Sequence, residues 1–313
     1  MASEFEKLAS GSTLTGDFEE LASNSTPSGN STRLSQEEKI RRETYTDEEI
    51  HDVNKIVVTI PDTNTPIVVF FGSQASGKTM ALLRLIRFLE EKKKYNVVPE
   101  EVFRPQSDKH YAKMCAGLKD MAYSNFAPGG NDVISFMLVK VLDSIGNPIC
   151  QLLEAPGEHY FDGSANLSFP TYINEIRTTP NRKVWVFFVE QGWGNDATER
   201  NLYAQKICQM QQLISVEDKV VFLFNKADEK RATQYKPDGK PNLDIFYRNI
   251  QQQYPGIFTR YQNHGLASVL FGRDNFKAIC FSSGIFNNTN DGRKIWTPEK
   301  DFYCSDLWKV LMS

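Results

Sequence analysis

The chain has 313 residues, of which 40% are hydrophobic, 12% aromatic and 24% charged, and its formal net charge is −3 at pH 7. This composition is typical of a globular protein that can bury a sizeable core in one or two domains. The charge balance gives no reason to expect nucleic acid as a partner. The longest apolar runs, Thr65–Gly72 and Val184–Val189, are far shorter than the ~20 residues of a membrane helix, so we expect no membrane span.

The N-terminal part differs in composition from the rest. Residues 1–34 are rich in Ser, Thr and Asn and poor in large apolar residues, which predicts a disordered tail. An acidic near-repeat within it, Glu4–Ser10 and Asp17–Ser23, is either a partner-binding element or two turns that bind nothing. Residues 35–54 are charged and predict a helical lead-in, with capping-box spacing at Ser35/Glu38 and Thr46/Glu49.

The cysteine pattern and the first residues favour a cytoplasmic location. No charged-then-apolar signal segment opens the chain. The cysteines form no CxxC pair and lie in apolar or helical contexts, which indicates reduced core residues; they are Cys115, Cys150, Cys208, Cys280 and Cys304.

From residue 55 to residue 313, apolar strand-like runs alternate with helical patterns. This order predicts a doubly wound α/β domain with a mainly parallel sheet that helices cover on both faces. The expected strands are Ile56–Ile60, Ile67–Phe71, Val133–Leu142, Pro148–Leu153, Lys183–Val189, Lys219–Phe224 and Ala278–Phe281, the third and fourth forming a β-hairpin. The expected helices are Lys78–Lys94, Asp108–Tyr123, Ala197–Ile214, Leu243–Tyr254 and Ser305–Leu311.

A phosphate-binding loop lies between the strand Ile67–Phe71 and the helix that follows it. Its pattern is G-x-x-x-x-G-K-T, made by Gly72, Ser73, Gln74, Ala75, Ser76, Gly77, Lys78 and Thr79. Small residues allow successive backbone N–H groups to surround a phosphate, and the helix N-terminus adds partial positive charge. We expect Lys78 to reach the β- and γ-phosphates and the Thr79 hydroxyl to ligate Mg²⁺.

A second motif selects the base. Asn225, Lys226 and Asp228 form N-K-x-D after the strand Lys219–Phe224, at the sheet edge where α/β folds bind ligands. The Asp228 carboxylate can accept two N–H bonds from guanine, which adenine cannot supply; Asn225 would join this loop to the phosphate loop, and the Lys226 stem would cover the purine. Ser282 and Ser283 follow the strand Ala278–Phe281 and resemble a loop whose backbone amide meets guanine O6.

Between these two motifs, an apolar strand ends in Glu154 and is followed by Ala155, Pro156 and Gly157. This segment resembles the D-x-x-G motif of GTPases, and the resemblance implies that the carboxylate holds a Mg²⁺-bound water and that the Gly157 N–H meets the γ-phosphate.

Together the motifs resemble those of P-loop GTPases of the Ras-like and translation-factor class over roughly Lys55–Leu311. Among the branches of this class, the chain looks most like the divergent bacterial GTPases that regulate larger assemblies. The resemblance implies a six-stranded G domain over residues 55–313 that binds GTP or GDP with Mg²⁺, held by Thr79 and Glu154. It also implies hydrolysis of GTP to GDP and phosphate by an in-line water, with Lys78 in the catalytic machinery.

The sequence departs from this family at three positions. Glu154 replaces the usual Asp, and no threonine occurs between Thr79 and Thr171 to act as the switch residue. Ser124, Ser135 or the segment Phe126–Asn131 are candidates to replace it.

The third departure concerns the residue that positions water. Glu158 stands where Ras-like members have Gln, and His159 is an alternative. Because a carboxylate repels the γ-phosphate, we expect slow hydrolysis. An arginine from a partner would accelerate it, with Arg104, Arg177 and Arg182 as internal candidates.

The function expected from these residues is that of a slow GTPase that acts as a regulatory switch, read by a protein effector or activator. The alternative is a catalytically weak nucleotide-binding scaffold. An ATP-dependent enzyme such as a kinase is a third interpretation, which the N-K-x-D loop disfavours.

Overall fold

The computed structural model describes residues 41–127, 136–161, 163, 168–194, 197–230, 234–263, 272, 274–290 and 293–313. The described residues belong to one compact unit. The predicted tail of residues 1–34, the Ser35/Glu38 capping box, Ser135 and the segment 128–131 lie outside the described residues.

The core is a seven-stranded sheet in the order β2-β3-β4-β1-β5-β6-β7. All pairs are parallel except β2–β3 and β3–β4. The prediction of a doubly wound, mainly parallel sheet with a hairpin is confirmed, but the sheet has seven strands rather than six because β2 adds an edge strand. The strands are β1 (Ile67–Phe71), β2 (Asn96–Pro99), β3 (Met137–Leu142), β4 (Pro148–Glu154), β5 (Lys183–Glu190), β6 (Lys219–Asn225) and β7 (Lys277–Cys280).

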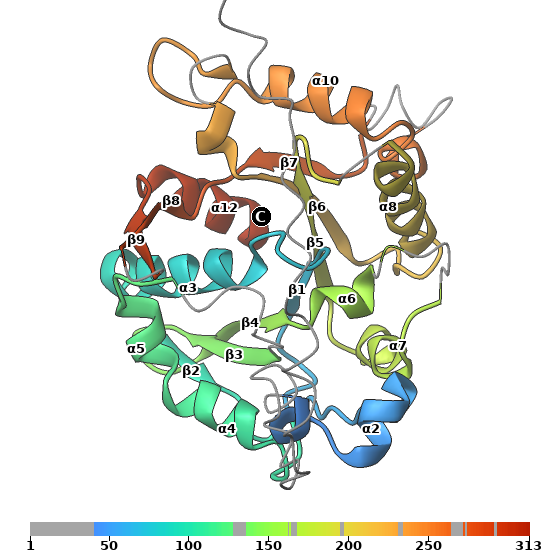
Figure 1. Cartoon of the computed structure of the whole chain (residues 1–313), viewed down its shortest axis with the longest axis vertical. Coiled ribbons are helices and arrows are strands. Elements are labelled where there is room, and N and C mark those ends of the chain that lie inside the picture. Colours follow the sequence, from blue (N-terminus) through green and yellow to red (C-terminus); the bar gives the residue numbers. More distant parts are fainter. Residues whose placement is uncertain are drawn as a thin grey trace, which may run out of the picture. The chain divides into compact units, whose positions relative to one another are not determined.

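Helices cover both faces of this sheet, which is why the central strands are continuous apolar runs. Every residue of β1 is buried, as are seven of the eight residues of β5. In Figure 1, α3, α5 and α12 lie on one side of the sheet, and α6, α7 and α8 lie on the other. The helices are α2 (Asp47–His51), α3 (Lys78–Phe88), α4 (Lys109–Ala116), α5 (Leu118–Tyr123), α6 (Gly157–Tyr160), α7 (Thr171–Thr178), α8 (Ala197–Met210), α10 (Leu243–Gln253) and α12 (Phe302–Met312).

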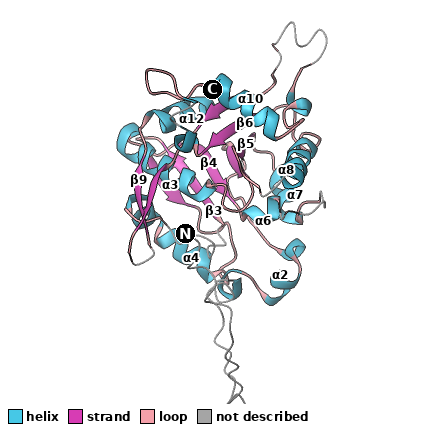
Figure 2. Cartoon of the chain, turned by 45° about the horizontal axis from the view of Figure 1, so that its top comes forward, coloured by secondary structure: helices cyan, strands magenta, loops and turns pink. Residues whose placement is uncertain are grey.

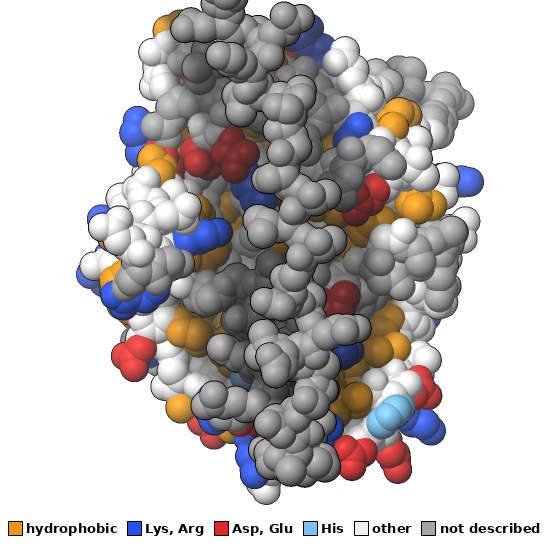
Figure 3. Space-filling model, in the orientation of Figure 1, with side chains coloured by type: hydrophobic (Ala, Val, Ile, Leu, Met, Phe, Trp, Pro, Cys, Tyr) orange, Lys and Arg blue, Asp and Glu red, His pale blue; other side chains and the backbone are white. Residues whose placement is uncertain are grey.

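Within the described part of the chain, no helix combines the length and the apolar character that crossing a bilayer requires. On the face that Figure 3 shows, acidic and basic side chains are interspersed with hydrophobic ones.

Two predicted elements differ from the structure. The helix expected over Asp108–Tyr123 is divided into α4 and α5 at Gly117. The strand expected over Ile56–Ile60 is wrong, because this segment belongs to no strand. Its backbone is bound by side chains instead: Val57 N–H donates to Glu49 Oε1, and Val57 O accepts from Arg104.

A hairpin that the sequence analysis did not predict forms a second, two-stranded sheet. It consists of β8 (Gly284–Asn288) and β9 (Lys294–Pro298), which pair antiparallel. Figures 1 and 2 both place it beside α3. It directly follows the loop of Ser282 and Ser283, and therefore starts at the candidate site.

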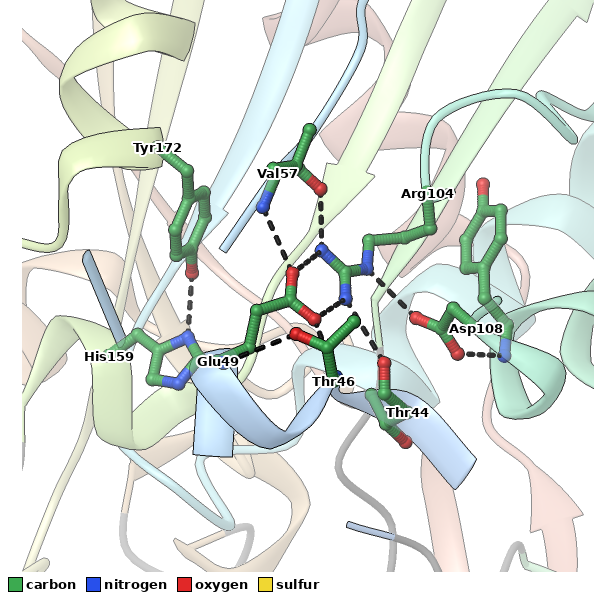
Figure 4. A network of polar contacts seen from close by, with 9 residues as sticks. Thr44, Thr46, Glu49, Val57, Arg104, Asp108, His159 and Tyr172 are labelled. Atoms are coloured by element: carbon green, nitrogen blue, oxygen red, sulfur yellow. Dashed lines mark hydrogen bonds and ion pairs between the residues drawn. The ribbon is translucent and has the colours of Figure 1, made fainter. Parts of the chain in front are cut away.

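The lead-in is attached to the domain by a buried ionic network (Figure 4). The predicted capping box at the start of α2 is present, with Thr46 and Glu49 bonding reciprocally. Both oxygens of the Glu49 carboxylate also accept hydrogen bonds from Arg104, and Arg104 donates a further one to Asp108 Oδ2 at 2.8 Å. The Arg104 side chain has no exposed surface and lies 4.8 Å from the centre of the Phe136 ring. Arg104 is therefore a structural residue, and its candidacy as a catalytic arginine is wrong.

We expect Arg104→Met to lower the free energy of unfolding by about 3–5 kcal/mol, because it leaves two buried carboxylates without their partner. Lys113→Ala removes a cation from an exposed ion pair with Glu43 and is the matched control, with an expected change of at most ~1 kcal/mol. Denaturant unfolding of the three proteins measures both. A loss for Arg104→Met as small as that for Lys113→Ala would contradict the assigned role.

Candidate functional site

The carboxyl ends of β1, β4 and β6 meet at one edge of the sheet, beside a cavity of about 480 Å³. Such edges bind ligands where the strand order reverses, and here the chain continues from β4 to the opposite side of β1. The cavity brings together most of the predicted site residues: Gln74, Ala75, Gly77, Lys78, Thr79, Glu154, Gly157, Glu158, Asn225, Lys226, Asp228 and Ser283.

The phosphate-binding loop joins β1 to α3 by a turn that needs small residues. Gly77, which precedes α3, has a φ of 87°, and a Cβ there would lie 2.4 Å from Asn225 Nδ2. Ala75 also has a positive φ, of 57°. A Cβ on Gly72 would lie 2.6 Å from Ser76 Oγ and 2.9 Å from Phe188 Cβ. Both glycines are therefore required by close contacts, Gly77 also by its left-handed backbone.

Lys78 is held at the wall of the cavity by its own loop. Its Nζ donates to the carbonyl oxygens of Gly72 at 3.0 Å and Ser73 at 2.9 Å. Burial lowers the pKa of Lys78 to about 8, against the opposing effect of the Glu154 and Glu158 carboxylates. A phosphate at this position would restore the preference for the charged ammonium.

The two predicted metal ligands contact each other. Thr79 Oγ1 donates to Glu154 Oε1 at 2.5 Å. Burial raises the pKa of Glu154 to about 7, although Lys78 and the Thr79 hydroxyl act in the opposite direction. Glu154 Oε2 is buried and has no hydrogen-bond partner among the described residues.

This donor set fits Mg²⁺. A hydroxyl and a carboxylate oxygen are hard ligands, and the orphaned Oε2 would be satisfied by the ion or by one of its waters. No group of three or more His, Cys, Asp and Glu side chains that could hold a metal occurs in the described parts of the chain. The remaining ligands would therefore be phosphate oxygens and water, as is usual for Mg²⁺ in phosphate-transfer sites.

The loop after β6 is tied to two neighbouring loops. Asn225 Nδ2 donates to Ser76 O at 2.7 Å, which joins it to the phosphate-binding loop. Ala227 N–H donates to Phe281 O at 3.0 Å, and Ser282 Oγ donates to Asp228 Oδ1 at 2.5 Å. Ser282 is buried behind Asp228 and does not line the cavity, so it orients the carboxylate, whereas Ser283 lies at the cavity wall.

Lys226 lies along the cavity in a strained conformation. Its φ is 53°, and its ammonium pairs with Glu190 Oε2 at 2.7 Å. The head group is thus held by β5, and the aliphatic stem is left to contact a ligand.

The start of α6 touches the phosphate-binding loop. A Cβ on Gly157 would lie 2.3 Å from Gln74 N and 2.5 Å from Ser73 C, both backbone atoms. Only glycine fits there. The next residue, Glu158, lines the cavity and also a second cavity of about 330 Å³.

The structure does not bring His159 into the first cavity. It lines the second one, where its Nδ1 lies 2.8 Å from Tyr172 Oη (Figure 4). Its ring packs near Tyr45 and Phe136. Burial lowers the pKa of His159 to about 4, with smaller contributions from Arg104, Arg41 and Lys78. We therefore leave His159 out of the proposed hydrolytic machinery.

The cavity wall also includes residues that were not assigned to the site from the sequence, among them Met80, Glu229, Gly284, Phe286 and Lys294. Ala127, which lines it too, belongs to the segment Phe126–Asn131 that was predicted as a switch candidate. Met80 adjoins the predicted Thr79. Phe286 and Lys294 come from the hairpin β8–β9. The sequence holds a signal for this hairpin, because two short strand-like segments flank Asn288–Gly292, which is rich in turn residues.

No protein-family model and no curated protein matches the sequence. Similar solved structures include nucleolar GTP-binding protein 1 from Plasmodium falciparum, with 12% identity over 72% of this chain and 81% of that chain at a TM-score of 0.36. The signal recognition particle receptor SRb-GTP/SRX complex from Chaetomium thermophilum has 11% identity over 74% of this chain and 96% of that chain, with a TM-score of 0.38. The Ski7 GTPase-like domain from S. cerevisiae, bound to GTP, has 16% identity over 86% of this chain and 52% of that chain, with a TM-score of 0.38.

The buried His159 leads to a pH-dependent stability. The pKa of His159 is about 4 in the folded protein and about 6.5 in the unfolded chain, so the unfolded chain takes up the proton first as the pH falls. The contribution of His159 to stability is therefore complete above pH 6.5 and is lost as the pH falls toward 4. Between these limits we expect the wild type to lose up to roughly 3 kcal/mol of unfolding free energy relative to His159→Gln. Denaturant unfolding at a series of pH values measures the difference. His51→Gln, at an exposed position of α2, is the control; a pH-independent difference for His159→Gln would contradict the expectation.

Proposed function

We propose that this protein binds GTP and GDP with Mg²⁺, hydrolyses GTP slowly, and acts as a regulatory switch for a protein partner. The observation that carries the proposal is a single cavity that joins the phosphate-binding loop, the Thr79–Glu154 pair and Asp228. A cavity of about 480 Å³ is within the range typical of small-molecule sites.

The residues divide the nucleotide between them. Lys78 exchanges its two loop carbonyls for phosphate oxygens, and its charge is then stabilised by the phosphate. Thr79 and Glu154 hold Mg²⁺, which when bound neutralises charge on the β- and γ-oxygens. Asp228, oriented by Ser282, accepts from the guanine edge, and the stem of Lys226 covers the base.

Slow turnover follows from the charges near the γ-phosphate. Glu158 places a carboxylate on the cavity beside Gly157, and repulsion disfavours a phosphate charge that grows in the transition state. Lysines are the only cationic side chains among the described residues that line this cavity. A partner that inserts an arginine would therefore supply what the described cavity lacks.

A second candidate function is a nucleotide-binding scaffold with little turnover. The hydrogen bond between Thr79 and Glu154 favours it, because the Thr79 hydroxyl and Glu154 Oε1 are then already bonded to each other, and the raised pKa of Glu154 weakens the carboxylate as a ligand. For either function we propose a cytoplasmic location, since the five cysteines are free and four of them are buried.

Binding and turnover in one assay separate the two functions. We expect wild type to bind GTP and to hydrolyse it with Mg²⁺, and Lys78→Ala to lose both, since the phosphates lose their buried cation. Lys309→Ala, at an exposed position of α12, is the matched control and should behave as wild type. Glu158→Gln should raise turnover about tenfold with little change in affinity, because it removes the repelling charge. Tight GTP binding by wild type and by Glu158→Gln, without turnover in either, would support the scaffold.

The base assignment has its own test. Asp228→Asn replaces an acceptor by an amide that donates, so preference should move from guanine to xanthine nucleotides by at least about 100-fold in relative affinity. Competition of GTP and xanthosine triphosphate for wild type and variant measures it. Unchanged selectivity for GTP would remove Asp228 from the base site.

A further inference from the structure

The hairpin β8–β9 is fixed to the loop that carries Ser282 and Ser283. β8 starts at Gly284, where a Cβ would lie 2.3 Å from Thr297 O and 2.4 Å from Trp296 Nε1. Trp296 is 1% exposed, and its indole N–H donates to Ser283 O at 3.1 Å. The indole thus fills the space that a side chain at Gly284 would take. The hairpin therefore leaves the loop of Ser282 and Ser283, here called the base loop, in one defined direction.

A second attachment lies on the other side of the hairpin. Trp296 N–H donates to Asn125 O at 2.7 Å, and Ala127 N–H donates to Lys294 O at 2.9 Å. Phe126 pairs with Ile295 as an isolated antiparallel bridge. The backbone of Lys294 is therefore held by the segment Asn125–Ala127, of which Ala127 itself lines the cavity.

The register of the hairpin directs two side chains to the cavity. Phe286 lies opposite Trp296, and Asn288 lies opposite Lys294, so these four residues share one face of the two strands. Phe286, which is 40% exposed, and Lys294 line the cavity, whereas Ile285 and Ile295 on the other face do not line it. The hairpin is thus one wall of the cavity.

The charges of the cavity indicate what Lys294 does there. Four carboxylates line it, those of Glu154, Glu158, Asp228 and Glu229. Of the three lysines, Lys78 is bonded to loop carbonyls and Lys226 is paired with Glu190. Lys294 has no ion pair among the described residues and is exposed. A polyphosphate adds further negative charge, so the lysine that has no ion pair in the described part of the chain is the one available to it.

We propose, on the basis of the function proposed above, that the hairpin β8–β9 binds the nucleotide: Phe286 packs on the base and Lys294 pairs with the polyphosphate. The order along the hairpin supports this division. Along β8, Phe286 lies two residues after Gly284, and Asn288 lies two residues after Phe286, with a rise of ~3.4 Å per residue. Lys294 lies opposite Asn288 and is therefore further from the base loop than Phe286. An aromatic ring suits a planar base, and an ammonium suits phosphate oxygens.

Calorimetric titration of GMP, GDP and GTP tests both assignments. Lys294→Ala and Lys294→Met should weaken GDP and GTP binding about tenfold and GMP binding less, and the loss should shrink at high salt, because it is a loss of charge pairing. Phe286→Ala should weaken all three nucleotides by a similar factor, with no dependence on salt. Lys300→Ala is the matched control: Lys300 is exposed, directly follows the hairpin and Glu299, and does not line the cavity.

The outcomes separate this inference from the proposed function. If wild type binds GDP and GTP while Lys294→Ala binds them equally well, the role of Lys294 is overturned and the proposed function stands. If Lys294→Met retains wild-type affinity but Lys294→Ala does not, the effect is one of packing and the charge pairing is overturned. If wild type binds no guanine nucleotide, the proposed function and this inference both fail. Thermal unfolding of each variant identifies any loss that comes from misfolding.

Discussion

The hydrogen bond from Asn225 to the carbonyl of Ser76 holds together the two halves of the candidate site. Asn225 is the last residue of β6 and Ser76 lies in the loop after β1, and β5 separates these two strands in the sheet. The end of β6 and the loop can approach only because Gly77 has no Cβ, since that atom would lie 2.4 Å from the Asn225 amide. For the proposed function, the distance between the phosphate-binding loop and Asp228 must match the length of a nucleotide. A rigid sheet with one short bridge across its edge provides that fixed distance.

The same edge carries an electrostatic conflict that a ligand would relieve. Burial drives Lys78 and Glu154 toward their neutral forms, with pKa values of about 8 and about 7 respectively. Each charge supports the other, but the hydrogen bonds of Lys78 go to carbonyl oxygens and one oxygen of Glu154 has no partner among the described residues. A phosphate next to Lys78 and a divalent cation next to Glu154 would give each group an opposite charge. The cavity is therefore better suited to a phosphate–metal pair than to either alone.

The predicted parts of the fold are those that local sequence determines. β1, β5 and β6 are continuous apolar runs, and the phosphate-binding loop needs particular residues at fixed spacing, so the edge of the sheet was predicted with its motifs. Ile56–Ile60 has the composition of a strand, but its backbone is bound by Glu49 and Arg104 from elsewhere in the chain. Such a contact leaves no local signal. Lys294 is an exposed lysine in a short strand, and the bonds of its hairpin to Ser283 and to the segment Asn125–Ala127 place it at the cavity.

Glu158 and His159 show how adjacent residues connect the site to the lead-in. Successive helical residues point about 100° apart, so in α6 Glu158 reaches the nucleotide cavity while His159 turns away from it. His159 packs against Tyr45, Phe136 and Tyr172, and Arg104 lies over the Phe136 ring. Arg104 also holds Glu49 of α2 (Figure 4). Because Gly157 touches the backbone of the phosphate-binding loop, a shift of this loop displaces α6. Close-packed rings cannot absorb that shift without moving, and the lead-in helix is their neighbour. A shift of the phosphate-binding loop would therefore reach the described part of the lead-in through α6 and these rings.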